Sequence, residues 1–85
     1  MRSPRQNKID VAITTVLELT GGFMLPDSIL KADAARLVVP RASDSELINS
    51  IEYHDRAGRL TTVQAETERK RKLNDAGTAW HQENA

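Results

Sequence analysis

Apolar residues recur at helical spacing in the first part of the chain, directly after a capping signal. Ser3, Pro4 and Gln6 fit a capping box with proline at the first helical position. The apolar positions that follow fall on one side of a helix: Ile9, Ala12, Ile13, Val16 and Leu17. Gly21–Gly22 then suits the left-handed backbone that follows a helix C-terminus. The pattern predicts a helix over about 4–20.

The next segment has an ambiguous start and a helical continuation. Phe23–Leu25 is apolar and precedes Pro26, so it fits either a short strand or an extended connection. Either Asp27 or Ser28 is then a suitable helix cap. The apolar residues that follow are Ile29, Leu30, Ala34, Leu37 and Val38. We expect a second helix over about 27–38.

A second capping box opens the third segment, because Ser43 is followed by Glu46 three residues later. On a helical wheel, one side carries Leu47, Ile48 and Ile51, with His54 at the edge of the core. The opposite side carries Ser45, Asn49, Glu52, Tyr53 and Arg56. Gly58 marks a C-terminus. A third helix is predicted over about 43–57.

The pattern after the third helix changes to that of a hairpin. Leu60–Val63 is short and rich in β-branched residues, which favours a strand, and Lys72–Leu73 begins a returning strand. Glu66–Arg71 is expected to form a charged tip, and with Lys72 it places four consecutive basic residues at the hairpin tip: Arg69, Lys70, Arg71 and Lys72. A hairpin is predicted over about 59–74. A short helix over about 75–82 follows, with Trp80 packing it against the rest of the core.

The last part of the chain resembles a known family. Gly58–Leu60 leads into a strand, and Lys72–Trp80 is similar to the lysine-leucine-threonine-x-x-glycine segment that ends the wing of many small bacterial winged-helix proteins. Asn74 stands where threonine is usual, and asparagine caps a helix equally well. Leu25–Pro26 followed by Leu30 is also similar to small stand-alone winged-helix proteins. The resemblance covers nearly the whole chain.

The winged helix-turn-helix resemblance implies an α+β fold with three helices, a β-hairpin wing and a short last helix, in one domain over 1–85. It implies that the third helix faces a major groove through Ser45, Asn49, Tyr53 and Arg56. It also implies that the wing, through Arg69, Lys70, Arg71 and Lys72, lies along a phosphate backbone. Winged helices serve as DNA readers, RNA binders and protein-interaction modules, so the fold alone does not select a function.

Charge is unevenly distributed, although 12 Lys and Arg residues balance 12 Asp and Glu residues. Residues 43–58 carry one positive and four negative charges, a net −3, whereas residues 59–75 carry five positive and three negative charges, a net +2. An acidic third helix opposes phosphate binding, and a basic wing favours it. If the chain binds nucleic acid, we expect the wing, together with Arg2 and Arg5, to contribute more than the third helix.

Each of these candidate residues also has an ordinary structural explanation. The basic residues fit a solvated loop that keeps a hairpin edge soluble, with Glu66 and Glu68 pairing across it. Asn49, Tyr53 and Arg56 fit a polar helix surface. Two functions therefore remain: a DNA-binding regulator or accessory factor with wing-led backbone contact, and an interaction module whose acidic third helix faces a basic protein partner. We expect a monomer or a weak homodimer, because no long additional helix serves dimerisation.

Catalytic, metal and membrane functions find no signal in the sequence. His54 and His81 are the only histidines and do not share helical spacing, and there is no cysteine, so neither a metal site nor a cofactor is expected. No nucleophile signature or phosphate-binding loop is present, so we do not expect an enzyme. Asp10 and Glu18 interrupt the apolar run that a signal peptide needs. No stretch approaches the roughly 18 apolar residues of a membrane span. A soluble cytoplasmic protein is expected.

Overall fold

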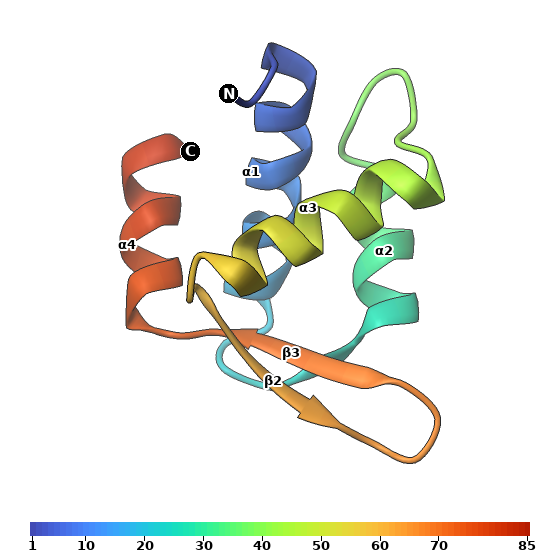
Figure 1. Cartoon of the computed structure of the whole chain (residues 1–85), viewed down its shortest axis with the longest axis vertical. Helices are drawn as coiled ribbons and strands as arrows, with labels where there is room; N and C mark the ends of the chain where they lie inside the picture. The colour runs from blue at the N-terminus through green and yellow to red at the C-terminus, as the bar shows by residue number, and fades with distance from the viewer.

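The computed structural model describes all 85 residues and contains four helices and a three-stranded antiparallel sheet (Figure 1). The helices are α1 (Pro4–Leu19), α2 (Asp27–Ala35), α3 (Asp44–Arg56) and α4 (Asp75–Asn84). The strands are β1 (Leu25–Pro26), β2 (Leu60–Gln64) and β3 (Arg69–Leu73). The predicted α+β class and order of elements are confirmed, and the layout is compatible with a winged helix.

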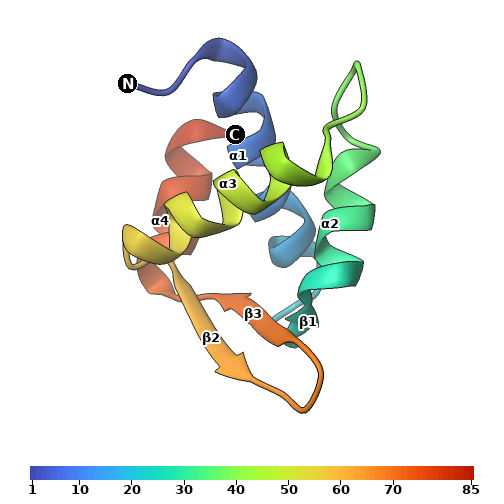
Figure 2. The ribbon, with the colours of Figure 1, turned by 45° about the vertical axis from the view of Figure 1, so that its right-hand side comes forward.

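The helices form a bundle above the sheet. α3 crosses in front of α1, with α2 and α4 on either side, and the hairpin lies at the end of the molecule away from both chain termini (Figures 1 and 2). The core draws mainly on α1, α2 and α3, with β2 closing it from below. It consists of Ile9, Ala12, Ile13, Val16, Leu17, Leu30, Ala34, Ala35, Val38, Ala42, Leu47, Ile51 and Leu60. Most of the hydrophobic stabilisation therefore comes from these three helices.

Both predicted capping boxes are present. At the start of α1, the Ser3 hydroxyl accepts from the Gln6 amide at 3.1 Å and the Gln6 side chain accepts from the Ser3 amide at 2.8 Å. At the start of α3, Ser43 and Glu46 form the same reciprocal pair at 3.2 and 3.0 Å. Each box satisfies two amides that a helix start would otherwise leave unpaired.

α2 differs from its prediction at both ends. Pro26 occupies the cap position and supplies no side-chain cap, so the prediction that Asp27 or Ser28 is the cap is wrong. The helix ends at Ala35 instead of near residue 38. The chain then turns so that Val38 is buried while Leu37 is 54% exposed. Residues before a proline avoid helical geometry, and Pro40 follows closely, which accounts for the early end.

The sheet has the order β1-β3-β2, which resolves the ambiguity over Phe23–Leu25 in favour of a short strand at Leu25–Pro26. β2 pairs with β3 from Leu60 opposite Leu73 to Gln64 opposite Arg69. This register leaves only residues 65–68 for the turn. The four basic residues therefore lie within β3, and the prediction that they form the tip of the hairpin is wrong.

Candidate nucleic-acid interface

The four basic residues of β3 are divided between the two sides of the wing. Leu73 packs against the core, which identifies the inner side of the strand. Because side chains alternate along a strand, Arg69 and Arg71 share that inner side and Lys70 and Lys72 project from the other. Directly opposed residues of an antiparallel pair share a side. We call the outer wing face the surface formed by Thr61, Val63, Lys70 and Lys72.

Arg71 is a buried structural residue, only 3% exposed. Its guanidinium donates two hydrogen bonds to the Asp27 carboxylate, at 3.0 and 3.1 Å, and one to the Thr62 hydroxyl at 3.3 Å. Asp55 of α3 lies 3.7 Å away. The side chain thus joins the wing to α2 and α3, and its hydrogen-bond donors face protein instead of solvent.

Arg2 is also committed to the fold. It donates two hydrogen bonds, at 3.0 and 2.8 Å, to the carboxylate of Asp10, which is completely buried on α1. The Ser50 hydroxyl of α3 donates to the same carboxylate at 2.7 Å. The Arg2 guanidinium lies 4.1 Å from the ring centre of Tyr53, where a cation is attracted to the aromatic face. This cluster, which the sequence pattern did not reveal, fastens α3 to α1.

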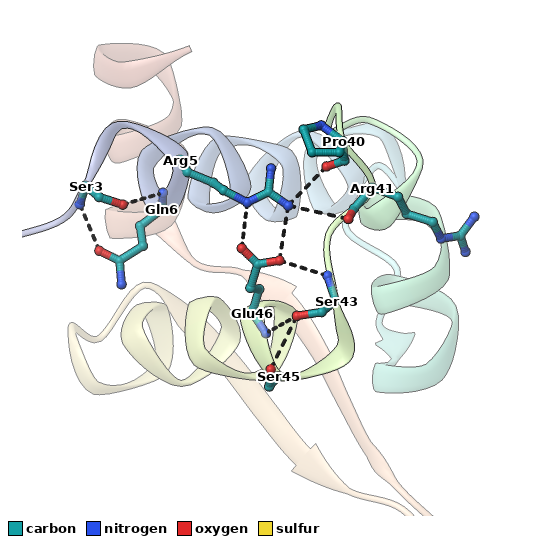
Figure 3. Close-up of polar contacts among 8 residues, drawn as sticks. All are labelled: Ser3, Arg5, Gln6, Pro40, Arg41, Ser43, Ser45 and Glu46. Carbon is teal, nitrogen blue, oxygen red and sulfur yellow. Dashed lines mark hydrogen bonds and ion pairs between the residues drawn. The ribbon is translucent and has the colours of Figure 1, made fainter.

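Arg5 spans from α1 to α3 (Figure 3). It donates to both carboxylate oxygens of Glu46, at 2.7 and 3.1 Å, and to the carbonyl oxygen of Pro40 at 3.0 Å. The hydrogen bonds from Arg5 and from the Ser43 amide lower the pKa of Glu46 to about 2. Glu46 therefore caps α3 and holds Arg5 with the same carboxylate, and Arg5 is not a free surface cation.

Every acidic residue of α3 has a cationic partner. The pairs are Asp44–Lys31 at 2.8 Å, Glu46–Arg5 at 2.7 Å, Glu52–Arg56 at 3.1 Å and Asp55–Arg71 at 3.7 Å. Three of the four cations come from outside the helix. The net charge of −3 counted along residues 43–58 is therefore offset in part by cations of α1, α2 and β3, with Arg71 shared between Asp55 and Asp27.

The cations that lack a carboxylate partner gather around the wing. Six of the 12 basic side chains form salt bridges, which leaves six that form none: Lys8, Arg41, Arg59, Arg69, Lys70 and Lys72. Four of the six lie within residues 59–72. Arg69 and Lys70 are exposed, and Lys72 is half-buried. Half of the cations that form no salt bridge therefore lie on β3, and Arg59, just before β2, lies against the rings of Tyr53 and Trp80.

The expected tip acids do not neutralise this charge. Neither Glu66 nor Glu68 forms a salt bridge with the basic strand, so the suggested pairing across the hairpin is absent. Instead, Glu68 accepts hydrogen bonds from the amide and the hydroxyl of Ser28, at 2.8 and 3.1 Å. These bonds lower the pKa of the Glu68 carboxyl. Glu68 thus supplies from the wing the cap that α2 lacks in its own sequence.

The polar stripe of α3 is only partly open to solvent. Asn49 is exposed, and Arg56 is 78% exposed while paired with Glu52. Tyr53 is half-buried between the guanidinium groups of Arg2 and Arg59, which lie 4.1 and 5.0 Å from its ring centre. Of the four residues expected to face a major groove, Ser45, Asn49 and Arg56 are therefore exposed, and only Tyr53 is half-buried.

His54 lies deeper than predicted. It is completely buried, and its Nε2 donates to the Asp10 carbonyl oxygen at 3.0 Å. This leaves Nδ1 as the acceptor that faces Arg59 at 3.4 Å. Burial lowers the pKa of His54. Trp80 is half-buried, and its ring packs edge-on against His54 with the two ring centres 4.8 Å apart. It thus joins α4 to the bundle as expected.

Comparisons of the chain with protein-family models, with curated proteins and with solved structures gave no match. The structure holds no cluster of three or more histidine, cysteine or acidic residues arranged to bind a metal. None of its helices has the length and apolar character that crossing a bilayer requires. The function is therefore argued from the geometry of the wing and of α3.

Proposed function

We propose that this chain is a small cytoplasmic winged-helix DNA-binding protein, acting as a transcriptional regulator or accessory factor, whose wing leads the contact with the phosphate backbone. One observation carries the proposal. Uncompensated cations gather at the wing, while the acidic residues of the neighbouring α3 are all paired. Phosphate neutralisation by free Lys and Arg supplies most of the sequence-independent affinity of DNA-binding proteins.

The outer wing face supplies the first part of the contact. Lys70 and Lys72 project from the same side of β3, two residues apart and so roughly 7 Å from each other along the strand. Two flexible lysine side chains on one side of a strand can both reach the same phosphate backbone. Arg69 adds an exposed guanidinium at the end of β3 next to the turn.

α3 supplies the second part. Asn49 and Arg56 are exposed on its polar side, and these residue types recognise adenine and guanine edges. To bind a base, Arg56 must first release Glu52. The free-energy cost of this release is small, because an exposed ion pair contributes only roughly 0–1 kcal/mol to stability. We therefore expect modest sequence preference on top of a larger backbone contribution. The alternative, an acidic α3 that binds a basic protein, must replace the cations that now pair with its carboxylates. Arg5 and Arg71 are held by further bonds within the fold, which counts against this alternative at Glu46 and Asp55.

The proposal is tested by titrating a labelled random-sequence duplex with the protein at two salt concentrations. The variant Lys70→Ala/Lys72→Ala should bind at least about tenfold more weakly, and its salt dependence should be flatter by about two phosphate contacts. Arg36→Glu is the matched control, because it changes the net charge by the same amount at the exposed residue that follows α2, away from the wing.

Two results would count against a wing-led contact. Equal weakening by the double variant and by Arg36→Glu would show a response to net charge alone. Absence of binding by the unmodified protein at low salt would remove DNA as the ligand, and capture of one stoichiometric basic protein would then favour the alternative. Backbone amide NMR shifts locate the contact directly, with the largest changes expected in residues 66–73 and smaller ones in α3.

A further inference from the structure

An apolar surface remains open on the side of α1 that faces away from α3. Val11 and Thr15 form its floor, and Leu37 and Val39, from the connection between α2 and α3, form one wall. Together with the end of α4 they enclose a groove of about 680 Å³, the largest hollow in the molecule. Leu37 and Val39 are 54% and 86% exposed. The surface is far more apolar than a solvent-facing helix requires.

Leu19 continues this surface at the other end of α1. It is 81% exposed and lies two turns beyond Val11, on the same side of the helix as Thr15. A second, smaller hollow beside Leu19 shares Leu37 with the main groove, so the two form one continuous strip along α1. The strip thus has a hollow at one end and a protruding leucine at the other.

Two charged residues of opposite sign stand at the ends of the strip, and neither has a partner in the chain. Lys8 precedes Val11 by one turn and Glu18 follows Thr15 by one turn, and both are exposed. The other charged residues of α1, Arg5 and Asp10, are both in salt bridges. The unpaired charges of α1 are therefore the two that border the apolar strip.

These features are self-complementary about a two-fold axis. If a second α1 lies antiparallel to the first, with the axis at the level of Ile13, Lys8 of each copy lies opposite Glu18 of the other. Val11 then lies opposite Thr15, and Leu19 of the second copy reaches the part of the first that lines the hollow. An interface of this kind forms every contact twice, as two-fold homodimers do.

We propose that this strip of α1 binds a second copy of the chain, with the two α1 helices antiparallel and Lys8 of each copy paired with Glu18 of the other. The arrangement leaves the DNA-facing surfaces open, because α3 packs on the Asp10 side of α1, away from Lys8 and Thr15. Two wings would then be carried by one dimer.

Sedimentation velocity over about a hundredfold range of protein concentration tests the proposal. The unmodified chain should shift from monomer to dimer within that range. Lys8→Glu and Glu18→Lys each place like charges together twice in the dimer, and each should raise the dissociation constant by about tenfold or more. The double variant Lys8→Glu/Glu18→Lys restores opposite charges and should dimerise to within about threefold of the unmodified chain.

Leu19→Asp should remove the dimer, because it places a charge in the hollow of the other copy. Ile29→Asp is the matched control, since Ile29 is 47% exposed near the start of α2 and does not line the strip. All of these positions are exposed, and circular dichroism checks that each variant folds. A monomer at every concentration overturns the proposal. So does a dimer that the single charge reversals leave intact, or one that the double variant fails to restore.

Discussion

α3 and the wing differ in what their charges do. The four acidic residues of α3 each meet a cation, and its buried side reaches Asp10 through Ser50 and His54. In the wing, Lys70, Lys72 and Arg69 have no carboxylate partner, and only Arg71 is built into the interior. Charge in α3 serves the fold, whereas most of the charge in the wing is available to a ligand.

This difference shows why the charge of a segment is a poor guide to its surface. The count along the sequence assigns −3 to residues 43–58, yet three cations from other elements offset part of that charge in space. The count of +2 for residues 59–75 includes Arg71, which is buried, and Glu68, which caps another helix. Substitution of a buried, paired charge should therefore mainly lower stability, whereas substitution of an exposed, unpaired charge should mainly weaken DNA binding.

The largest effect is expected at the buried contact that holds α3 to α1. Asp10→Ala removes the acceptor of Arg2 and Ser50 and should lower the free energy of unfolding by about 3 kcal/mol. Asp33→Ala removes an exposed acceptor of Arg36 and should cost less than about 0.5 kcal/mol. Urea denaturation measures both. Similar losses in the two variants would contradict a structural role for the buried cluster.

A smaller effect should separate two neighbours in β3. Arg71→Met keeps the apolar stem but removes the bonds to Asp27 and Thr62, and should destabilise by about 2 kcal/mol. Lys70→Met changes an exposed side chain and should alter stability by less than about 0.5 kcal/mol. In the DNA titration of folded samples the expected order of the two variants is reversed, because Lys70→Met should weaken DNA binding more than Arg71→Met does. Destabilisation by Lys70→Met as large as that by Arg71→Met would show that the two sides of the wing are not distinct.

The buried histidine makes stability depend on pH. Burial lowers the pKa of His54 in the folded state, so the unfolded chain binds the proton more readily. The stability that neutral, buried His54 provides is therefore fully present above about pH 6.5. As the pH falls below that value, the free energy of unfolding decreases by at most about 1.4 kcal/mol per pH unit. Denaturation midpoints at several pH values measure this slope. His54→Gln should flatten it, and a slope that survives the substitution would assign it to other groups.

The smallest effect concerns an exposed ion pair. The Glu46 carboxyl should titrate with a pKa of about 2, and Arg5→Gln should raise that value while the Ser43 amide keeps it below the ordinary range. Carbon-detected NMR of the carboxyl follows both. The pair stabilises the fold above the ordinary pKa of glutamate, about 4.3, and this contribution fades as the pH falls toward 2. An unchanged pKa in Arg5→Gln would mean that the bond to Arg5 does not set it.

The sequence predicted those features that depend on neighbouring residues. The capping boxes at Ser3 and Ser43 involve partners three residues away, and the structure contains both. The helices and the hairpin follow from patterns of the same short range. These features fix the order of elements.

Apart from the ends of α2 and the position of the hairpin turn, the features that the sequence did not predict join distant residues. Arg71 meets Asp27 across 44 positions, and Ser50 meets Asp10 across 40. No periodic pattern marks such a pair, because each side chain becomes buried only when its partner is brought to it. For the same reason Arg71 is indistinguishable in sequence from Lys70 and Lys72, although only Arg71 is buried.

The bond from Glu68 to Ser28 has a consequence for motion. Glu68, at the end of the hairpin turn, caps the first turn of α2, so separating the two segments leaves the Ser28 amide without its acceptor. We expect the two segments to fray as one unit and to show matched hydrogen-exchange protection. Movement of the wing toward a phosphate backbone would then displace α2 as well, because the Glu68 carboxylate links the two segments.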